Sequence, residues 1–197
     1  MNRFCVIITH NRPELLRETW QAIGPQIEMV IILDNASDPP VDAVRLQLAA
    51  GKAAVTVLRD PEQPPNLSRF WNVMFDEAAE LAPRDQVDVS TMVDGADTRY
   101  VDGRLLPYDV AVLNDDSIVP AGWYDACATA LREHPTAVVA HTGDHPVHEL
   151  DLLTDFTFAR SRRMAPHAFL VRGEVGLRSD ESMRWWYFDD DFSRQAI

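Results

Sequence analysis

Apolar residues follow two alternating patterns along this chain. Short continuous runs rich in Val and Ile occupy 4–9, 29–33 and 55–58, and they predict buried strands. Between these runs, apolar residues recur every three or four positions in 13–23 and 41–50, which is the spacing of a helix with one buried face. A strand–helix–strand order with crossovers of this length predicts a parallel sheet with right-handed connections.

The second half continues this order with one interruption. Helical spacing at 66–81 and 123–131 alternates with apolar runs that predict strands at 110–113, 137–140, 156–159 and 168–171. The acidic stretch 83–107 breaks the order, and we expect an inserted loop or hairpin there, with an edge strand at 89–93. The whole pattern predicts an α/β fold in a single domain over 1–197, with a mainly parallel, Rossmann-like sheet flanked by helices.

The composition is that of an ordinary globular protein. The 197 residues are 46% hydrophobic and 25% charged, with a net charge of −13. We find no apolar run of membrane-spanning length and no signal peptide, so we expect a cytoplasmic protein without a membrane span. The acidic balance disfavours general binding of nucleic acid, although Arg160, Arg162 and Arg163 form a local basic patch. Cys5 and Cys127 fall in predicted elements and are expected to be core residues.

Three predicted strands end in polar residues, at the edge where open α/β sheets bind ligands. Thr9 and Asp34 close the first two strands, and Asn114-Asp115-Asp116 follows the strand at 110–113. Adjacent carboxylates repel each other and are rarely buried unpaired, so a pair at this edge suits a hard cation such as Mg²⁺ or Mn²⁺ that leaves room for phosphate oxygens. A solvated turn before Pro120 accounts for the local residues equally well.

Three separated motifs together resemble the family 2 glycosyltransferases. They are residues 7–12 with 32–37, residues 114–124, and residues 169–192. In the second motif an acidic triplet is followed by apolar residues, proline, glycine and an aromatic residue, as in the D-x-D region of that family, with Asn114 where many members have the first Asp. The resemblance implies a GT-A fold with a nucleotide-sugar-binding half (1–120) and an acceptor-side half (121–197) that carries a smaller mixed sheet.

On the donor side, the resemblance implies a metal ligand and a set of nucleotide contacts. Asp116 would bind Mn²⁺ or Mg²⁺, and Asp34 would accept the N3–H of uracil, so a UDP-sugar is the expected donor. The helix that begins after Asn66 offers free N–H groups suited to a diphosphate. The expected nucleotide-sugar contacts are Thr9, Asn11, Arg12, Asp34, Asn35, Arg69, Asn114 and Asp115.

On the acceptor side, the resemblance implies a general base in the C-terminal acidic motif. Asp189, with Asp190 as the alternative, would take this role, because a sugar hydroxyl is a poor nucleophile until a positioned carboxylate accepts its proton. Trp185, Trp186 and Asp191 would face the acceptor, which is a glycan, a small molecule or a modified DNA base. The implied reaction is a metal-dependent transfer of the sugar to an acceptor hydroxyl with inversion.

Other functions share parts of this pattern. A non-catalytic nucleotide-sugar-binding protein would keep Asp34 and Asp116, and a phage-type DNA-base glycosyltransferase would use the arginine patch. A sugar-phosphate nucleotidyltransferase shares the fold class, but residues 10–13 (His-Asn-Arg-Pro) stand where its glycine-rich phosphate loop is expected.

Two further groups of residues are weaker metal candidates. The histidines at 141, 145 and 148 match no tight zinc spacing, although one of them can complete the coordination of a metal at Asp116. The acidic spacing within 83–107 permits calcium binding, but a solvated acidic loop explains it better.

Overall fold

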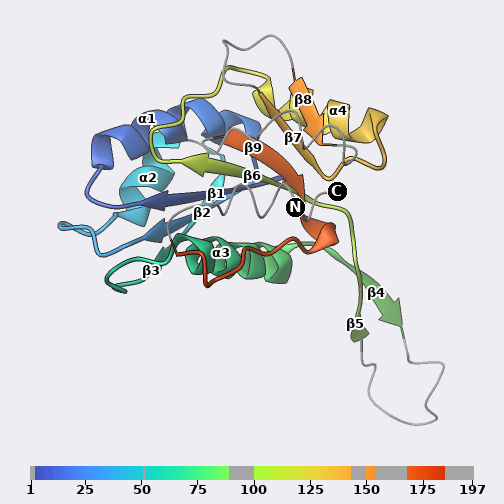
Figure 1. Cartoon of the computed structure of the whole chain (residues 1–197), viewed down its shortest axis with the longest axis horizontal. Helices are drawn as coiled ribbons and strands as arrows, with labels where there is room; N and C mark the ends of the chain where they lie inside the picture. Colours follow the sequence, from blue (N-terminus) through green and yellow to red (C-terminus); the bar gives the residue numbers. More distant parts are fainter. Residues whose placement is uncertain (1–2, 51, 89–99, 143–149, 154–167, 185–197) are drawn as a thin grey trace.

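The computed structural model describes residues 3–50, 52–88, 100–142, 150–153 and 168–184, and within them a seven-stranded sheet forms the centre of the molecule (Figure 1). The strands are β1 (Arg3–Thr9), β2 (Met29–Asp34), β3 (Ala54–Arg59), β6 (Asp109–Asn114), β7 (Val139–Thr142), β8 (Leu150–Leu153) and β9 (Ala168–Arg172). Their order is β3-β2-β1-β6-β9-β7-β8. The first four are mutually parallel, and β9, β7 and β8 are joined to them by antiparallel pairing.

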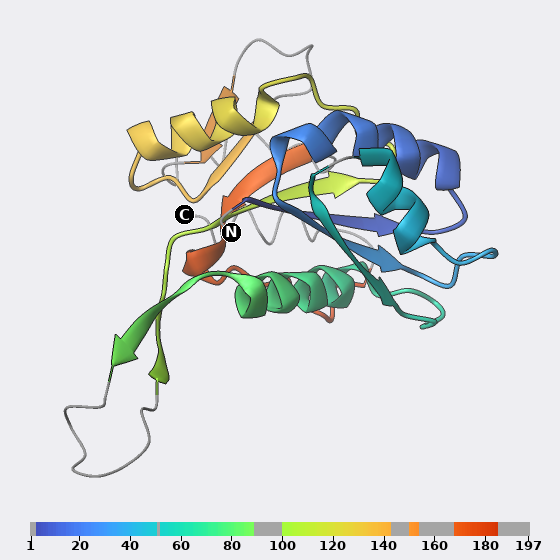
Figure 2. The same ribbon diagram turned by 180° about the vertical axis from the view of Figure 1, so that it is seen from behind.

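Helices cover both faces of this sheet. The described helices are α1 (Pro13–Ile23), α2 (Ala43–Ala50), α3 (Leu67–Leu81) and α4 (Trp123–Glu133). Helices α1, α2 and α4 lie on one face and α3 lies on the other, as the two opposite views show (Figures 1 and 2). The result is a three-layer α/β/α sandwich, which is how parallel sheets bury both of their faces.

Because side chains alternate along each strand, the sheet has a separate hydrophobic core on each of its two faces. Successive side chains point to opposite faces, so Ile7 joins Trp20 and Tyr124 on the α1–α4 side, whereas Val6 joins Phe70 on the α3 side. All five of these side chains are buried. In the first core the Trp20 Nε1–H donates to the backbone O of Leu46 at 2.9 Å, which ties α1 to α2.

A hairpin extends from the body of the protein. Strands β4 (Arg84–Asp88) and β5 (Tyr100–Leu105) pair with each other antiparallel and form a sheet of their own. Figure 2 shows them projecting away from the three layers. At the base, the backbone N–H of Leu106 donates to the carbonyl of Pro83 at 2.9 Å, so the chain leaves and rejoins the body at one point.

The predicted α/β class is confirmed, with differences in detail. The later strands do not form a smaller sheet of their own: β9 pairs with β6, and β7 and β8 extend the same sheet. Strand β8 was not predicted, β4 lies at 84–88, and the strands expected at 89–93 and 156–159 lie outside the described residues. Cys5 and Cys127 are free and buried. In the described part of the chain, every helix is too short or too polar to cross a membrane.

Candidate functional site

Polar side chains gather at the carboxyl edge of the parallel strands. Thr9 of β1 is level with Asp34 of β2, and Ile8 is level with Asn114 of β6. This edge is a topological switch point, because the connection from β1 to β2 carries α1 on one face whereas β6 follows α3 on the other. The predicted residues from three strands are therefore brought to one place.

Asp115 and Asp116 are adjacent in sequence but lie in different environments. The Thr9 hydroxyl donates to Asp115 Oδ2 at 2.8 Å, and the Thr19 hydroxyl donates to the Asp115 carbonyl at 2.9 Å. The Asp115 side chain is 8% exposed and that of Asp116 is 49% exposed. Burial raises the pKa of Asp115, an effect that the Thr9 hydrogen bond and the Arg12 guanidinium oppose. Asp115 is thus a fixed structural carboxylate, and Asp116 is the one open to a ligand.

Arg12 bridges the two carboxylates. Its Nη1 lies 3.3 Å from Asp115 Oδ1 and 3.5 Å from Asp116 Oδ2. Arg12 is the residue before α1, where Pro13 takes the first helical position, and its side chain makes no cap hydrogen bond. The guanidinium is therefore held at the sheet edge by the two carboxylates.

Asp34 is built into its own loop. The residue is 1% exposed, and its two carboxylate oxygens accept the backbone N–H groups of Ser37 and Val41 at 2.8 and 3.0 Å. Asp34 thus stabilises the turn that follows it, a role that is compatible with the Asn-Ala-Ser sequence of that turn. Asp34 lines neither of the two cavities described below, and contact between Asp34 and a base stays a prediction.

Asn11 and Asn35 join neighbouring loops at this edge. Asn11 has φ +54°, a conformation that Asn tolerates, and its backbone N–H donates to Ser37 Oγ at 2.9 Å while its Oδ1 accepts the N–H of Asp38 at 2.7 Å. The buried Asn35 Nδ2 donates to the carbonyls of Asp60 and Glu62 at 2.8 and 3.2 Å. Both predicted residues therefore hold the loops at this edge together by hydrogen bonds.

Arg69, in the first turn of α3, forms an ion-pair cluster with two carboxylates of the loop that precedes the helix. Its Nε donates to Glu62 Oε2 at 2.8 Å, and its Nη2 pairs with Asp60 Oδ2. The guanidinium also lies 5.4 Å from the ring centroid of Phe70. Arg69 holds residues 60–69 together, and its expected contact with a nucleotide stays a prediction.

A cavity of about 470 Å³, here called the strand-end cavity, opens at this edge. Its size falls within the range of roughly 300–1,000 Å³ typical of small-molecule sites. The predicted residues among its lining are Thr9, Arg12, Asn35, Asn114, Asp115 and Asp116. Gln63 and Pro65 also line the cavity and were not predicted, although they follow the carboxyl end of β3 and the sheet-edge rule applies to them too.

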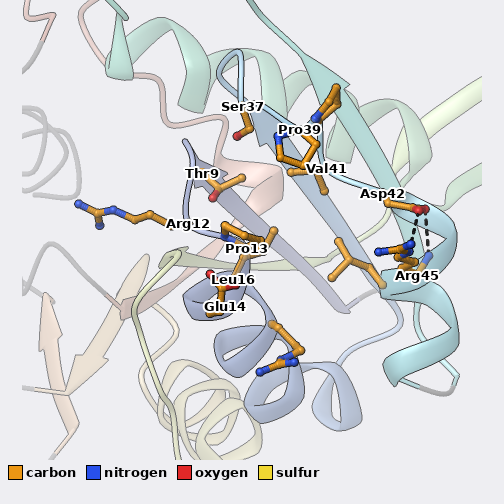
Figure 3. Close-up of a pocket in the computed structure, with 13 residues that line it drawn as sticks. Thr9, Arg12, Pro13, Glu14, Leu16, Ser37, Pro39, Val41, Asp42 and Arg45 are labelled. Atoms are coloured by element: carbon orange, nitrogen blue, oxygen red, sulfur yellow. Dashed lines mark hydrogen bonds and ion pairs between the residues drawn. The ribbon is translucent and has the colours of Figure 1, made fainter.

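A second cavity of about 310 Å³, the helix-side cavity, lies between α1 and the loop that leads to α2 (Figure 3). Its walls are largely apolar and include Pro13, Leu16, Pro39 and Val41. Arg12 lines both cavities, and in Figure 3 its side chain extends away from the other residues of the helix-side cavity.

The start of α3 is covered by a segment of the C-terminal part of the chain. Asn66 Oδ1 caps the helix by accepting the N–H of Arg69 at 3.1 Å, and the N–H of Leu67 donates to the carbonyl of Arg184 at 2.9 Å. Two donors that the sequence offered to a diphosphate are therefore already engaged. Because Leu67 also lines the strand-end cavity, the chain reaches residue 184 beside that cavity.

Asn72 anchors the same segment one turn later. Its Nδ2 donates to the Ser179 carbonyl at 2.9 Å and to Glu181 Oε1 at 3.0 Å, and its Oδ1 accepts the Ser179 N–H at 2.8 Å. The Ser68 hydroxyl donates to the Met183 carbonyl at 2.6 Å. These polar contacts hold residues 179–184, here called the C-terminal strap, along α3.

Several predicted residues lie outside the described part of the chain. They are Trp185, Trp186, Asp189, Asp190, Asp191, His145 and His148. His141 is described: it is buried in β7, level with Phe169 of β9, which is level with Val112 of β6, inside the sheet rather than at its edge. Among the described residues, no group of three or more His, Cys, Asp or Glu side chains is arranged to hold a metal ion.

Comparisons with known proteins add little to this geometry. No protein-family model matches the chain, and no curated protein is similar to it in sequence. Among solved structures, it is similar to the crystal structure of 4-diphosphocytidyl-2C-methyl-D-erythritol synthase from Anaerococcus prevotii, with a TM-score of 0.43 and 12% sequence identity. That similarity covers 95% of this chain and 84% of that one. At this level of similarity we draw no conclusion from it about ligand or reaction.

Proposed function

We propose that this chain is a nucleotide-binding transferase, and specifically a metal-dependent inverting glycosyltransferase that uses a nucleotide diphosphate sugar such as a UDP-sugar. The observation that carries the proposal is the pair of carboxylates at the strand-end cavity, one buried and fixed, the other exposed. The buried Asp115 is fixed in place by its hydrogen bond from Thr9, and Asp116 lines the cavity with an exposed carboxylate.

The side chains at the cavity fit Mg²⁺ or Mn²⁺ as a partner of a diphosphate. Asp116 supplies one exposed carboxylate, and Asn114, which carries an amide oxygen, lines the same cavity, whereas both oxygens of Asp115 already accept hydrogen bonds. Mg²⁺ is commonly held by one or two carboxylates together with waters and substrate phosphates. When bound, the metal would supply electrostatic stabilisation of the departing diphosphate.

The chemical step needs a base on the acceptor side. The acceptor oxygen forms a bond to C1 of the sugar, its proton passes to a carboxylate, and the bond from C1 to the diphosphate oxygen breaks with its electron pair remaining on the diphosphate. We assign the carboxylate to Asp189, with Asp190 as the alternative, on the basis of the resemblance. The C-terminal strap supports this assignment, since it brings residue 184 beside the cavity.

Thermal unfolding with a panel of nucleoside diphosphates and their sugars, with and without Mn²⁺, tests the donor site. At about 100 times its dissociation constant, a ligand adds roughly 2.7 kcal/mol to the free energy of unfolding. We expect a metal-dependent rise in Tm with one nucleotide, lost in Asp116→Asn. Glu18→Gln, which removes one negative charge from an exposed position on α1, is the matched control and should keep the rise.

Two outcomes would change the proposal. The absence of a Tm response to every nucleotide would contradict it, and the two carboxylates would then belong to a solvated turn. Binding without transfer to any acceptor, in full-length protein with an intact C-terminal motif, would favour the non-catalytic nucleotide-sugar-binding protein.

A further inference from the structure

Arg12 occupies the place where a cation and a diphosphate would also meet. Its Nη1 lies between Asp115 Oδ1 at 3.3 Å and Asp116 Oδ2 at 3.5 Å. Among the residues described as lining the strand-end cavity, it is the only arginine or lysine. The two carboxylates and one guanidinium together carry a single net negative charge, which would repel a diphosphate.

The two halves of this bridge differ in how easily they can open. Asp115 is buried and also bound by Thr9, so it cannot turn away without breaking a buried hydrogen bond. The Asp116 and Arg12 side chains are 49% and 54% exposed, so the contact between them can open into solvent at little cost. Separation of Arg12 from Asp116 is therefore the movement that the site permits.

A divalent cation and Arg12 cannot share Asp116 without repulsion. A metal ion bound to the Asp116 carboxylate would lie within a few ångströms of the guanidinium, where like charges disfavour each other. Arg12 lines the cavity, and its side chain has no cap role in α1 that would oppose a movement of the guanidinium within it. Its planar fork matches the oxygens of a phosphate group.

We propose that Arg12 is an internal counter-ion that leaves Asp116 when a divalent cation binds and then pairs with the phosphates of the donor. This inference rests on the proposed function, because it requires a metal at Asp116. Its consequence is energetic coupling: Arg12 weakens metal binding in the absence of a diphosphate, and it strengthens the mutual binding of metal and diphosphate.

Manganese binding followed by electron paramagnetic resonance tests this coupling without an activity assay. The proteins are the native chain, Arg12→Gln and Arg17→Gln, an arginine of α1 that lines the helix-side cavity and gives the same change in charge. Each is titrated with MnCl₂ alone and with inorganic pyrophosphate, and the manganese–pyrophosphate complex in solution is measured separately.

We expect Arg12→Gln to bind manganese about fivefold more tightly than the native chain when pyrophosphate is absent. Pyrophosphate should tighten manganese binding about tenfold in the native chain and in Arg17→Gln, and much less in Arg12→Gln. Equal manganese affinities and equal pyrophosphate effects in the native chain and Arg12→Gln would overturn the inference.

Asp116→Asn separates failure of the inference from failure of the proposed function. If manganese binds the native chain through Asp116 but Arg12→Gln behaves like the native chain, the metal site stands and only the role of Arg12 is wrong. If manganese binding is absent in every protein, or is unchanged in Asp116→Asn, both the metal site and the inference are wrong.

Discussion

At the residue scale, the site depends on unequal roles for side chains that look equivalent in the sequence. Asp115 and Asp116 are both acidic, yet one is buried against Thr9 and the other faces the cavity. The sequence placed both at the correct sheet edge, but their burial depends on Thr9, Thr19 and Arg12, which lie about a hundred residues away. Distant pairings of this kind leave no periodic signal in the sequence.

Asp109 predicts a dependence of stability on pH. Burial, and next the negative charge of Glu174, raise its pKa to about 6, while Arg172, Arg132 and Arg3 oppose that rise. The folded state holds this proton more tightly than the unfolded state. The stabilisation of the fold by protonated Asp109 is therefore fully present below pH 4 and is lost as the pH rises towards 6. Above pH 6 the contribution of Asp109 to the free energy of unfolding no longer changes with pH. At neutral pH the charged Asp109 therefore destabilises the fold.

We expect Asp109→Asn to raise the free energy of unfolding at pH 7 by roughly 2 kcal/mol and to remove this loss between pH 4 and 6. Urea unfolding at several pH values measures both effects. Asp125→Asn, an exposed carboxylate paired with Arg3, is the control and should keep the native slope. A slope unchanged in Asp109→Asn would show that another group titrates.

At the element scale, hydrophobic periodicity located the strands and helices well. It did not reveal the C-terminal strap, which is held in place by side-chain hydrogen bonds. Strand β1 and helices α1 and α3 begin or end within one or two residues of the predicted ranges. The C-terminal strap has no such pattern, because residues 179–184 are held by amide and hydroxyl groups of α3 rather than by an apolar face. The sequence predicted nucleotide contacts at the start of α3 and at Arg69. In the structure Ser68 and Asn72 bind this strap, and Arg69 pairs with Asp60 and Glu62.

Asn72 is the residue on which we expect the strap to depend most. Asn72→Ala removes three hydrogen bonds, two of them to Ser179, and frees a segment that can then reach water. We expect hydrogen exchange at the Ser179 amide to become about tenfold faster or more while the core amides of β1 and β6 keep their protection. Glu80→Ala, an exposed position on the same helix, should leave Ser179 unchanged.

If Ser179 keeps its protection in Asn72→Ala, the strap is held by other contacts. If all amides exchange faster together, Asn72 contributes to the global fold instead.

At the scale of the whole molecule, the order of strands was predictable only in part. The crossovers from β1 to β2 and from β2 to β3 follow from the strand–helix–strand pattern, because such units are parallel and right-handed. The later strands carry no signal that decides between a separate sheet and an extension of the first, and the structure shows that β9 pairs antiparallel with β6. The sequence predicted an inserted loop or hairpin over 83–107, and β4 and β5 form such a hairpin, but no pattern predicted that it projects from the body.

The hairpin should be dispensable for folding. It pairs with itself, and Leu106 and Pro83 are within hydrogen-bonding distance at its base, so a two-residue Asn-Gly turn can replace residues 84–105. We expect this shortened chain to unfold cooperatively with a Tm within about 5 °C of the native value, since each kcal/mol shifts the Tm by only a few degrees in a chain of this size. A chain that no longer folds would show that the hairpin belongs to the core.

The central claim is that a divalent cation and a nucleotide diphosphate meet at Asp116 in the strand-end cavity. Paramagnetic broadening of amide resonances by Mn²⁺, recorded with UDP present, locates the metal directly. The account predicts broadening centred on the amides of Thr9, Asn114 and Ser117, which is lost in Asp116→Asn, with the amides at the end of α4 unaffected. Broadening centred anywhere else, or the same broadening in Asp116→Asn, would contradict it.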